Sequence, residues 1–466
     1  MKNSYIIYCA MALFLLAGCK MTSSPSSEPV ADISGNKTWE SIAISDDGKY
    51  LAAVVWDGHI YTSSNSGKTW RDRSTAGSEI AGNKYWFSIA ISDDGKYLAA
   101  VAWGGYIYTS SDLGETWSDR SGTGSAIAGN KIWYSIAMSD DGQKLAAVAY
   151  GGHIYTSLNS GKTWRDRSTA GSEISGNKDW YSIAMSGNGD ELAAVVGGTI
   201  GDGRHIYTYS NSGKTWTNRS TAAGSVSVIG GNRNWQSIAM SGNGEKLAAV
   251  VFPGNLYTAS DSGADWTNRS TPSGSEITGS KSWTSIAMSG NGKYLAAVAW
   301  GGHIYTSSNS GATWTNRSTA AGSVSVIGGS KNWQSIAMSE DGKKLAAVVN
   351  GGHLYTATKS GTTWTWTDRS TGAIAGNKNW YSIAMSGNGD ELAAVAYNGH
   401  LYTSSNLGAD WTNRSTAAGS VSVIGGNRNW RSIAMSDNGD ELAAVAYNGH
   451  LYTATKSGAD WTDRSE

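Results

Sequence analysis

A cation stands at the same place in each of nine repeated segments of this 466-residue chain, two residues before a recurring tryptophan. Cations that converge on one surface attract anions, so these nine residues are candidate ligand-binding groups. The alternative is that each charge lies in solvent while the aliphatic stem packs over the neighbouring tryptophan. The nine cations are Lys37, Lys84, Lys131, Lys178, Arg233, Lys281, Lys331, Lys378 and Arg428.

A second recurring position, at the end of the second predicted strand of each repeat, is mostly aromatic. Aromatic faces beside charged hydrogen-bonding groups are typical of sites for sugars and anionic glycans. Alternatively, these rings only cover the ends of hairpins. The aromatic residues are Trp56, Trp103, Tyr150, Phe252, Trp300, Tyr397 and Tyr447, with Asn350 as an exception.

The residue directly after each recurring tryptophan varies, although the segment around it is nearly constant. Variation among near-identical copies indicates that the fold does not dictate this residue type. We therefore expect this position to line the central channel if the copies form a ring. The candidates are Glu40, Phe87, Tyr134, Tyr181, Gln236, Thr284, Gln334, Tyr381 and Arg431.

Seven histidines also share one repeat position, but we predict no metal site from them. One histidine per repeat places the imidazoles on separate structural units, too far apart for a shared tetrahedral site. We expect no other cofactor. The formal net charge of -1 disfavours nucleic acid as a partner, because that polyanion selects strongly basic surfaces. The histidines are His59, His153, His205, His303, His353, His400 and His450.

The recurring tryptophans mark a repeat whose steps run from 47 to 55 residues. A fixed period near 50 indicates an array of one supersecondary unit, because a single unit cannot bury its apolar faces alone. The tryptophans that open the repeats are Trp39, Trp86, Trp133, Trp180, Trp235, Trp283, Trp333, Trp380 and Trp430.

Each repeat predicts four short antiparallel strands. In the third copy, apolar strands over residues 133–139, 145–149 and 153–157 are separated by Asp-Gly and Gly-Gly turns, and a fourth strand ends near residue 168. Four such strands form the blade of a β-propeller. We predict an all-β propeller over residues 33–466, as a single nine-bladed ring, with an open or two-lobed array as the alternative.

The turn between the third and fourth predicted strands carries a motif. It reads Ser-x-(Asp/Asn)-x-Gly-x-Thr-Trp at residues 63–70, 110–117, 157–164 and 307–314. This motif resembles the Asp-box, or BNR repeat, of sialidase-like propellers, and the chain also resembles sortilin-type and photosystem II assembly factor propellers. The resemblance implies that these turns are structural and lie away from the functional face. It leaves function open, because such propellers include enzymes, receptors and assembly factors.

The sequence of the N-terminal residues predicts that the protein is exported. Lys2 precedes an apolar run that ends in Leu16-Ala17-Gly18-Cys19, which resembles a bacterial lipoprotein signal. The resemblance implies that residues 1–18 are a cleaved signal peptide, that Cys19 carries the lipid and that residues 19–32 form a flexible tether. Because Lys20 is not the aspartate of inner-membrane retention, it implies the outer membrane. An ordinary secretory signal is the alternative.

Symmetry favours binding over catalysis. A glycosidase needs unlike groups at one point, usually two carboxylates, whereas near-identical repeats place like groups in a circle. We therefore predict a monomeric, lipid-anchored, non-enzymatic binding or scaffold module of the cell envelope. Its positive channel face would recognise a glycan, another anionic ligand or a protein. The alternative is a divergent sialidase-like glycoside hydrolase that uses Glu40, Tyr134, Tyr181 and Tyr381.

The lipid assignment is tested by Cys19→Ala. Without the thiol there is no acylation site, so we expect the variant to leave the membrane fraction for the soluble fraction of fractionated cells. Retention of the variant in membranes would contradict the lipoprotein assignment.

Overall fold

The computed structural model describes residues 37–122, 124–169, 172–196, 205–210, 215–220, 229, 233–270, 276–320, 323–416, 424, 426–447, 449–455 and 460–463. The predicted signal peptide at 1–18, Cys19 and the tether at 19–32 lie outside these residues. None of the helices in the described part is long and apolar enough to cross a membrane.

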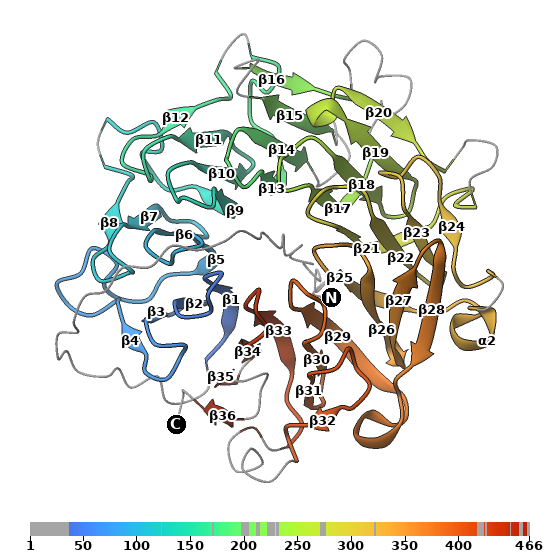
Figure 1. Ribbon diagram of the computed structural model, residues 1–466. Helices are drawn as coiled ribbons and strands as arrows, with labels where there is room; N and C mark the ends of the chain where they lie inside the picture. The colour runs from blue at the N-terminus through green and yellow to red at the C-terminus, as the bar shows by residue number, and fades with distance from the viewer. Residues whose placement is uncertain are drawn as a thin grey trace, which may run out of the picture.

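The described residues form a β-propeller, as predicted. Each repeat forms one blade, whose four strands pair with their sequence neighbours in antiparallel register, as in the order β1-β2-β3-β4. Figure 1 shows the blades arranged around one axis, with the first strand of each blade nearest the centre. Blades are numbered here in chain order.

The first strand of each blade begins at or just before the recurring tryptophan. These strands are β1 (Trp39–Ile44), β5 (Trp86–Ile91), β9 (Ile132–Met138), β13 (Trp180–Met185), β17 (Trp235–Met240), β21 (Ser282–Met288), β25 (Trp333–Met338), β29 (Lys378–Met385) and β33 (Trp430–Met435). The second strands carry the Leu-Ala-Ala-Val sequence. They are β2 (Leu51–Val55), β6 (Leu98–Ala102), β10 (Leu145–Tyr150), β14 (Glu191–Val196), β18 (Leu247–Val251), β22 (Leu295–Trp300), β26 (Lys344–Gly352), β30 (Leu392–Ala396) and β34 (Glu441–Ala446).

The third strands contain the Tyr-Thr dipeptide. They are β3 (Ile60–Ser63), β7 (Ile107–Ser110), β11 (Ile154–Ser157), β15 (Ile206–Ser210), β19 (Leu256–Ser260), β23 (Ile304–Ser307), β27 (Leu354–Ser360), β31 (Leu401–Ser404) and β35 (Leu451–Thr455). The fourth strands are mostly short. They are β4 (Arg71–Asp72), β8 (Ser118–Asp119), β12 (Arg165–Asp166), β16 (Thr215–Asn218), β20 (Asp265–Asn268), β24 (Thr315–Asn316), β28 (Thr363–Asp368), β32 (Thr412–Asn413) and β36 (Asp460–Asp463). Short helical segments are α2 (Val324–Ile327), η1 (Asp261–Gly263) and η2 (Gly372–Ile374).

The hydrophobic core lies between neighbouring blades. Trp86 of blade 2 packs against Ala52 and Val54 of blade 1, and all three side chains are fully buried. The alanines allow close approach of two sheets, and the indole fills the layer between them. Its Nε1 donates to the backbone carbonyl of Gly58 at 3.0 Å. Loss of one such ring would cost about 3–5 kcal/mol, since large-to-small core changes of this kind leave a cavity.

The two ends of the described array meet. Trp39 and Ile42 of blade 1 share a buried cluster with Ala443 and Val445 of blade 9. Lys37 N–H donates to the carbonyl of Gly449 at 2.8 Å, and Gly449 N–H donates back at 3.1 Å. Because each blade keeps its own four strands, closure depends on face packing and this bridge rather than on strand exchange.

The turns divide the ring into two faces. In blade 1 the turn after the third strand lies beside the turn after the first strand, since Ser66 N–H donates to the carbonyl of Lys49 at 2.8 Å. We call this end the turn face. At the other end, the hairpin turn at Gly58 pairs with Lys84 in the linker to blade 2, through hydrogen bonds of 3.0 and 2.9 Å. We call this end the linker face.

Local hydrogen bonds hold the motif between the third and fourth strands. In blade 2, Ser110 Oγ donates to Asp112 Oδ1 at 2.7 Å, and Thr116 N–H donates to the same oxygen at 2.9 Å. The Asp112 carboxylate therefore accepts the hydrogen bonds of its own turn. Burial by itself would raise the pKa of this carboxyl, but the hydrogen bonds outweigh burial and lower the pKa below its usual value. This geometry gives the motif a structural task on the turn face.

Candidate functional site

All nine predicted cations lie on the linker face, where each packs on the tyrosine of the third strand in its own blade. The distances from the charged group to the ring centroid run from 5.0 to 5.9 Å. The tyrosine in turn packs on the opening tryptophan, with ring centroids 5.3 Å apart for Trp133 and Tyr155. The cation thus contacts a tyrosine, one layer further out than the tryptophan considered from the sequence.

Several of these lysines also donate to backbone. Lys131 Nζ donates to the carbonyl of Ala128 at 2.6 Å, three residues earlier, and four more lysines make the same bond at 2.7–3.0 Å. Burial lowers the pKa of Lys84, Lys131, Lys281 and Lys378. Burial thus works against each charge, while the tyrosine contact and the backbone hydrogen bond hold the ammonium group in place, and ligand binding by these lysines stays a prediction.

The variable residue after each tryptophan occupies a β-bulge. In every blade the register between the first two strands shifts between the tryptophan and the serine two residues later, as between Trp86 and Ser88. The residue between them, such as Phe87, is therefore left out of the pairing. Bulges commonly redirect a side chain beside functional sites. One backbone geometry here carries residues of very different chemistry.

Two of the predicted residue sets meet in a continuous aromatic arc over blades 1 to 4. We define the aromatic arc as Trp56, Tyr85, Phe87, Trp103, Tyr134, Tyr150 and Tyr181. Phe87 lies between Trp103 at 5.7 Å and Tyr134 at 4.8 Å, measured between ring centroids. Tyr134 then contacts Tyr150 at 5.4 Å and Tyr181 at 5.2 Å. At the other end, Trp56 contacts Trp103 at 6.0 Å and Tyr85 at 5.3 Å.

The arc contains one residue that the repeat pattern did not single out. Tyr85 lies between the cation and the opening tryptophan of blade 2 and is 46% exposed. The equivalent positions mostly hold smaller polar residues, such as Thr38 and Asn234. The available signal was a bulky aromatic residue at a position that is polar in every other copy except the third, which has Ile132.

The opposite half of the linker face is different. Its bulge positions hold Gln236, Thr284 and Gln334, and Thr284 Oγ1 donates to the carbonyl of Trp333 at 2.9 Å. The strand-end aromatics remain exposed there, as with Trp300 at 39%. Phe252, Tyr397 and Tyr447 on this half are also exposed, and Asn350 is half-buried. The ring of Tyr381 lies 6.4 Å from that of Tyr397, measured between centroids. Glu40 is half-buried, and the side chain of Arg431 lies outside the described part.

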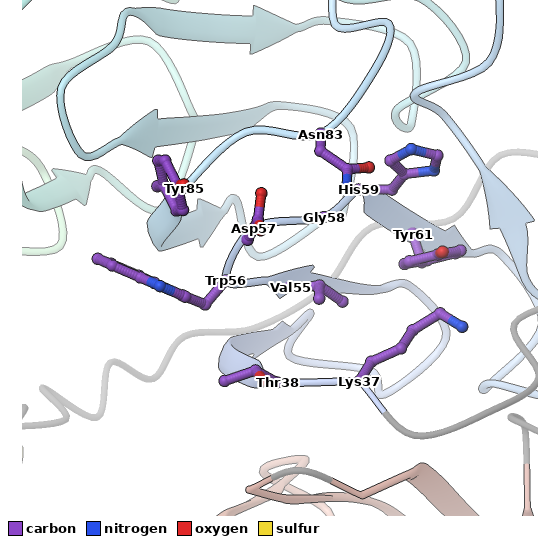
Figure 2. Close-up of a pocket in the computed structure, with 10 residues that line it drawn as sticks. All are labelled: Lys37, Thr38, Val55, Trp56, Asp57, Gly58, His59, Tyr61, Asn83 and Tyr85. Atoms are coloured by element: carbon purple, nitrogen blue, oxygen red, sulfur yellow. The ribbon is translucent and has the colours of Figure 1, made fainter.

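A pocket of about 460 Å³ opens on the linker face of blade 1. Figure 2 shows Trp56 and Tyr85 on one side of it and Lys37 and His59 on the other, with Asp57 between them. A pocket of about 380 Å³ occupies the equivalent place on blade 5, beside Arg233 and Phe252. Both pockets combine a cation with backbone turn atoms, but Trp56, Tyr61 and Tyr85 line the pocket on blade 1, whereas Phe252 is the one aromatic residue that lines the pocket on blade 5.

Other recurring polar side chains have structural partners. His59 Nδ1 lies 2.6 Å from Asp72 Oδ2 across the third and fourth strands, and Arg120 Nε donates to Thr109 Oγ1 at 2.6 Å. Glu79 accepts from the backbone N–H of Asp119 in the next blade at 2.5 Å. Within the part of the chain that the structure describes, no group of three or more His, Cys, Asp or Glu side chains could hold a metal ion.

The turn face carries acids near the axis, at the end opposite the cations. The N–H of Asp46 donates to the carbonyl of Asp93, and Asp93 N–H to that of Asp140, at 3.1 and 3.0 Å; such bonds continue from blade to blade as far as Asp437. This chain of backbone bonds brings like charges together. Burial, as the largest cause, and repulsion by the carboxylates of Asp140 and Asp46 raise the pKa of Asp93 to about 8. Burial, as the largest cause, and repulsion by the carboxylate of Asp437 raise the pKa of Asp46 to about 6.

These raised pKa values predict pH-dependent stability. An unfolded carboxyl titrates near 4, so between about pH 4 and pH 8 the folded state holds protons that the unfolded state has released. Stability must then fall as pH rises through this range. We expect Asp93→Asn to flatten the fall in melting temperature measured by circular dichroism between pH 5 and pH 8. Asp93→Gly should flatten the fall in the same way, because four other copies have glycine at this position. If the melting temperatures of both variants fall with pH in parallel with those of the wild type, the prediction is contradicted.

The cation–tyrosine contacts predict a stability effect. Changing Lys84, Lys131 and Lys178 together to methionine keeps the stems but removes the charges. A cation–π contact contributes about 0.5–1 kcal/mol at an exposed site, so the triple variant should melt below the wild type in thermal scans. Lys162→Met, at an exposed turn lysine, is the control. An unchanged melting temperature would contradict a net stabilising effect of these contacts.

No protein-family model matches this chain, and no curated protein matches it. Similar solved structures include a GH74 xyloglucanase from Xanthomonas campestris, with 14% identity, a TM-score of 0.41 and coverage of 93% of this chain and 74% of that one. YCF48 from Cyanidioschyzon merolae shows 15% identity and a TM-score of 0.43, over 70% and 95% of the two chains. YCF48 bound to D1 peptide shows 18% identity and a TM-score of 0.41, over 70% and 92%. These similarities concern the β-propeller fold and no more.

Proposed function

We propose that this protein is a non-enzymatic binding module that recognises a glycan on its linker face. The observation that carries the proposal is the aromatic arc over blades 1 to 4. Sugars present C–H faces that pack on aromatic rings, while their hydroxyl groups need hydrogen-bonding partners beside those rings. The arc offers both, since Tyr85 and Tyr181 are 46% and 37% exposed and each carries a hydroxyl group.

The repeats supply an internal comparison in favour of a binding role. Blades 5 to 7 make the same bulge with Gln236, Thr284 and Gln334, so the bulge itself does not require an aromatic residue. Phe87 and Tyr134 are nevertheless aromatic, and they support the exposed rings from below, being only 5% and 6% exposed themselves. A patch of aromatic surface that the fold does not need is best explained by a ligand.

The geometry favours rings over cations as the main contacts. The cations lie over tyrosines and, for five lysines, donate to backbone carbonyls, so an anionic ligand would compete with these contacts. This consideration supports a glycan bound by stacking and hydroxyl contacts over a ligand held chiefly by charge.

The chemistry of Tyr134 also supports binding rather than catalysis. Burial, followed by the neighbouring Tyr181 and Tyr150, raises the pKa of its phenol above the usual value. A hydroxyl group that stays protonated is a poor nucleophile, and a tyrosine nucleophile is what the sialidase-like alternative would require.

The proposal places the module in the cell envelope through a lipid on Cys19. The tetrapeptide Leu16-Ala17-Gly18-Cys19 supports this part, and it lies outside the described residues. A tether over residues 19–32 would let the ring reach a polymer near the membrane surface.

The arc is tested by the double variant Trp103→Ala/Tyr181→Ala. Each lost stacking contact removes about 0.5–1.5 kcal/mol, which corresponds to roughly tenfold weaker binding for the pair. Binding is measured by affinity electrophoresis in gels that contain neutral or acidic polysaccharides, and reducing ends are assayed in parallel.

Trp300→Ala is the matched control, because Trp300 has the same repeat position on blade 6 but lies outside the arc. We expect its binding to equal that of the wild type, with no release of reducing ends by any of the three proteins. Hydrolysis of any polysaccharide would contradict the non-enzymatic assignment, and equal losses in the double variant and Trp300→Ala would contradict the arc.

A further inference from the structure

The pocket on blade 1 differs in chemistry from the rest of the linker face. Its volume of about 460 Å³ lies in the range of small-ligand sites. It lies between the hairpin turn at Asp57 and Gly58 and the linker that carries Asn83 and Tyr85. Two structural units therefore shape it, and their relative position is set by the bridge between Gly58 and Lys84.

One wall of the pocket is a supported aromatic platform. The Trp56 ring contacts those of Tyr85, Phe87 and Trp103, at centroid distances of 5.3, 6.1 and 6.0 Å. Three neighbours restrict the indole, so little side-chain entropy is lost when a ligand packs on it. Figure 2 shows Trp56 and Tyr85 together at this side of the pocket.

The other walls carry hydrogen-bonding groups of three kinds. Thr38 supplies a hydroxyl, Asp57 an exposed carboxylate and Asn83 an exposed amide. Side chains of this kind can accept from and donate to vicinal hydroxyl groups. An aromatic wall beside such groups matches a sugar ring, which has an apolar face and a polar rim.

The charges select among sugars. Lys37 brings one positive charge, with its Nζ 5.9 Å from the ring centroid of Tyr61, and Asp57 brings one negative charge. Among the lining side chains, Lys37 and Asp57 bring one charge of each sign and His59 is paired with Asp72, so the pocket has no excess positive charge to hold a carboxylate. Asp57 would also repel the carboxylate of a uronic or sialic acid.

The carboxylate is particular to blade 1. No other copy with this short turn has an acid at the position of Asp57: the equivalents are Gly104, Gly151, Pro253, Gly301, Gly351, Asn398 and Asn448. Asp57 and Asn398 both adopt a positive φ, of 55° and 48°. Since asparagine already occupies this conformation in blade 8, the backbone does not require aspartate in blade 1.

We infer that the blade 1 pocket is the primary subsite of the glycan and binds one neutral hexose unit, stacked on Trp56 and hydrogen-bonded by Asp57, Asn83 and Thr38. This inference rests on the proposed function and deepens it: the ligand is a neutral polysaccharide, and its neighbouring units extend toward Trp103. Acidic glycans are excluded by Asp57.

The test uses full-length protein and hexasaccharide probes. The neutral probes are cellohexaose, mannohexaose and chitohexaose, and the acidic probes are the hexamers of galacturonic and mannuronic acid. Titration calorimetry should detect binding of at least one neutral hexamer and of neither acidic one. Trp56→Ala should weaken that binding at least tenfold, whereas Trp56→Phe, the residue type of blade 5, should retain most of it.

Asp57→Asn provides a readout that a merely structural role would not move. The substitution should weaken the binding of the neutral hexamer several-fold and raise the affinity for an acidic hexamer, while the melting temperature stays unchanged. Trp300→Ala, at the same repeat position on blade 6, is the matched control and should bind as the wild type does.

The outcomes separate this inference from the proposed function. If the Trp103→Ala/Tyr181→Ala variant loses binding while Trp56→Ala and Asp57→Asn do not, the subsite is wrong and the glycan-binding proposal stands. If acidic hexamers bind as tightly as neutral ones, the selection for neutral sugars is overturned. If the wild type binds no hexamer and no polysaccharide, both proposals fall.

Discussion

The structure depends on the packing of one tryptophan per repeat against the second strand of the preceding blade. At the seam between blades 1 and 2, the indole of Trp86 fills the layer above Ala52 and Val54, and its Nε1 binds the carbonyl of Gly58. The small residues of Leu-Ala-Ala-Val let adjacent sheets approach closely, which a bulkier strand would prevent. Because the same contact recurs around the ring, most constant residues of the repeat serve it. The third-strand tyrosine supports the tryptophan, and the cation covers the tyrosine.

This arrangement leaves few positions open to function. The bulge after the tryptophan is one of them, since its backbone is the same in every blade while its residue changes. An unpaired bulge residue can vary without loss of ladder hydrogen bonds. The chain uses this freedom unevenly: aromatic residues gather on blades 2 to 4, and polar ones occupy blades 5 to 7. The functional asymmetry of a nearly symmetric ring therefore arises at the least constrained position.

The two faces have different electrostatic characters. On the linker face, each cation packs on the third-strand tyrosine of its own blade. On the turn face, backbone bonds between blades draw the carboxyl groups of Asp46, Asp93 and Asp140 together, and burial raises their pKa values. Gly187, at the equivalent position of blade 4, leaves room for the carboxylate of Asp140, which lies where a Cβ of residue 187 would be.

The sequence by itself determined the blade. The period of 47 to 55 residues, the alternation of turns with apolar runs and the tryptophan at each start predicted four strands per repeat, because these features depend on local geometry. They also separated the turn face from the linker face. Only the tertiary structure decided what the side chains contact. The partner of Lys131 is Tyr155, two strands away in the same blade, and Tyr85 meets Trp56 across a blade boundary. Such contacts depend on the angle between sheets, which no spacing along the chain encodes. For that reason the sequence predicted the strand-end aromatics and the channel-lining residues as separate sets, and only the packed ring showed where they join.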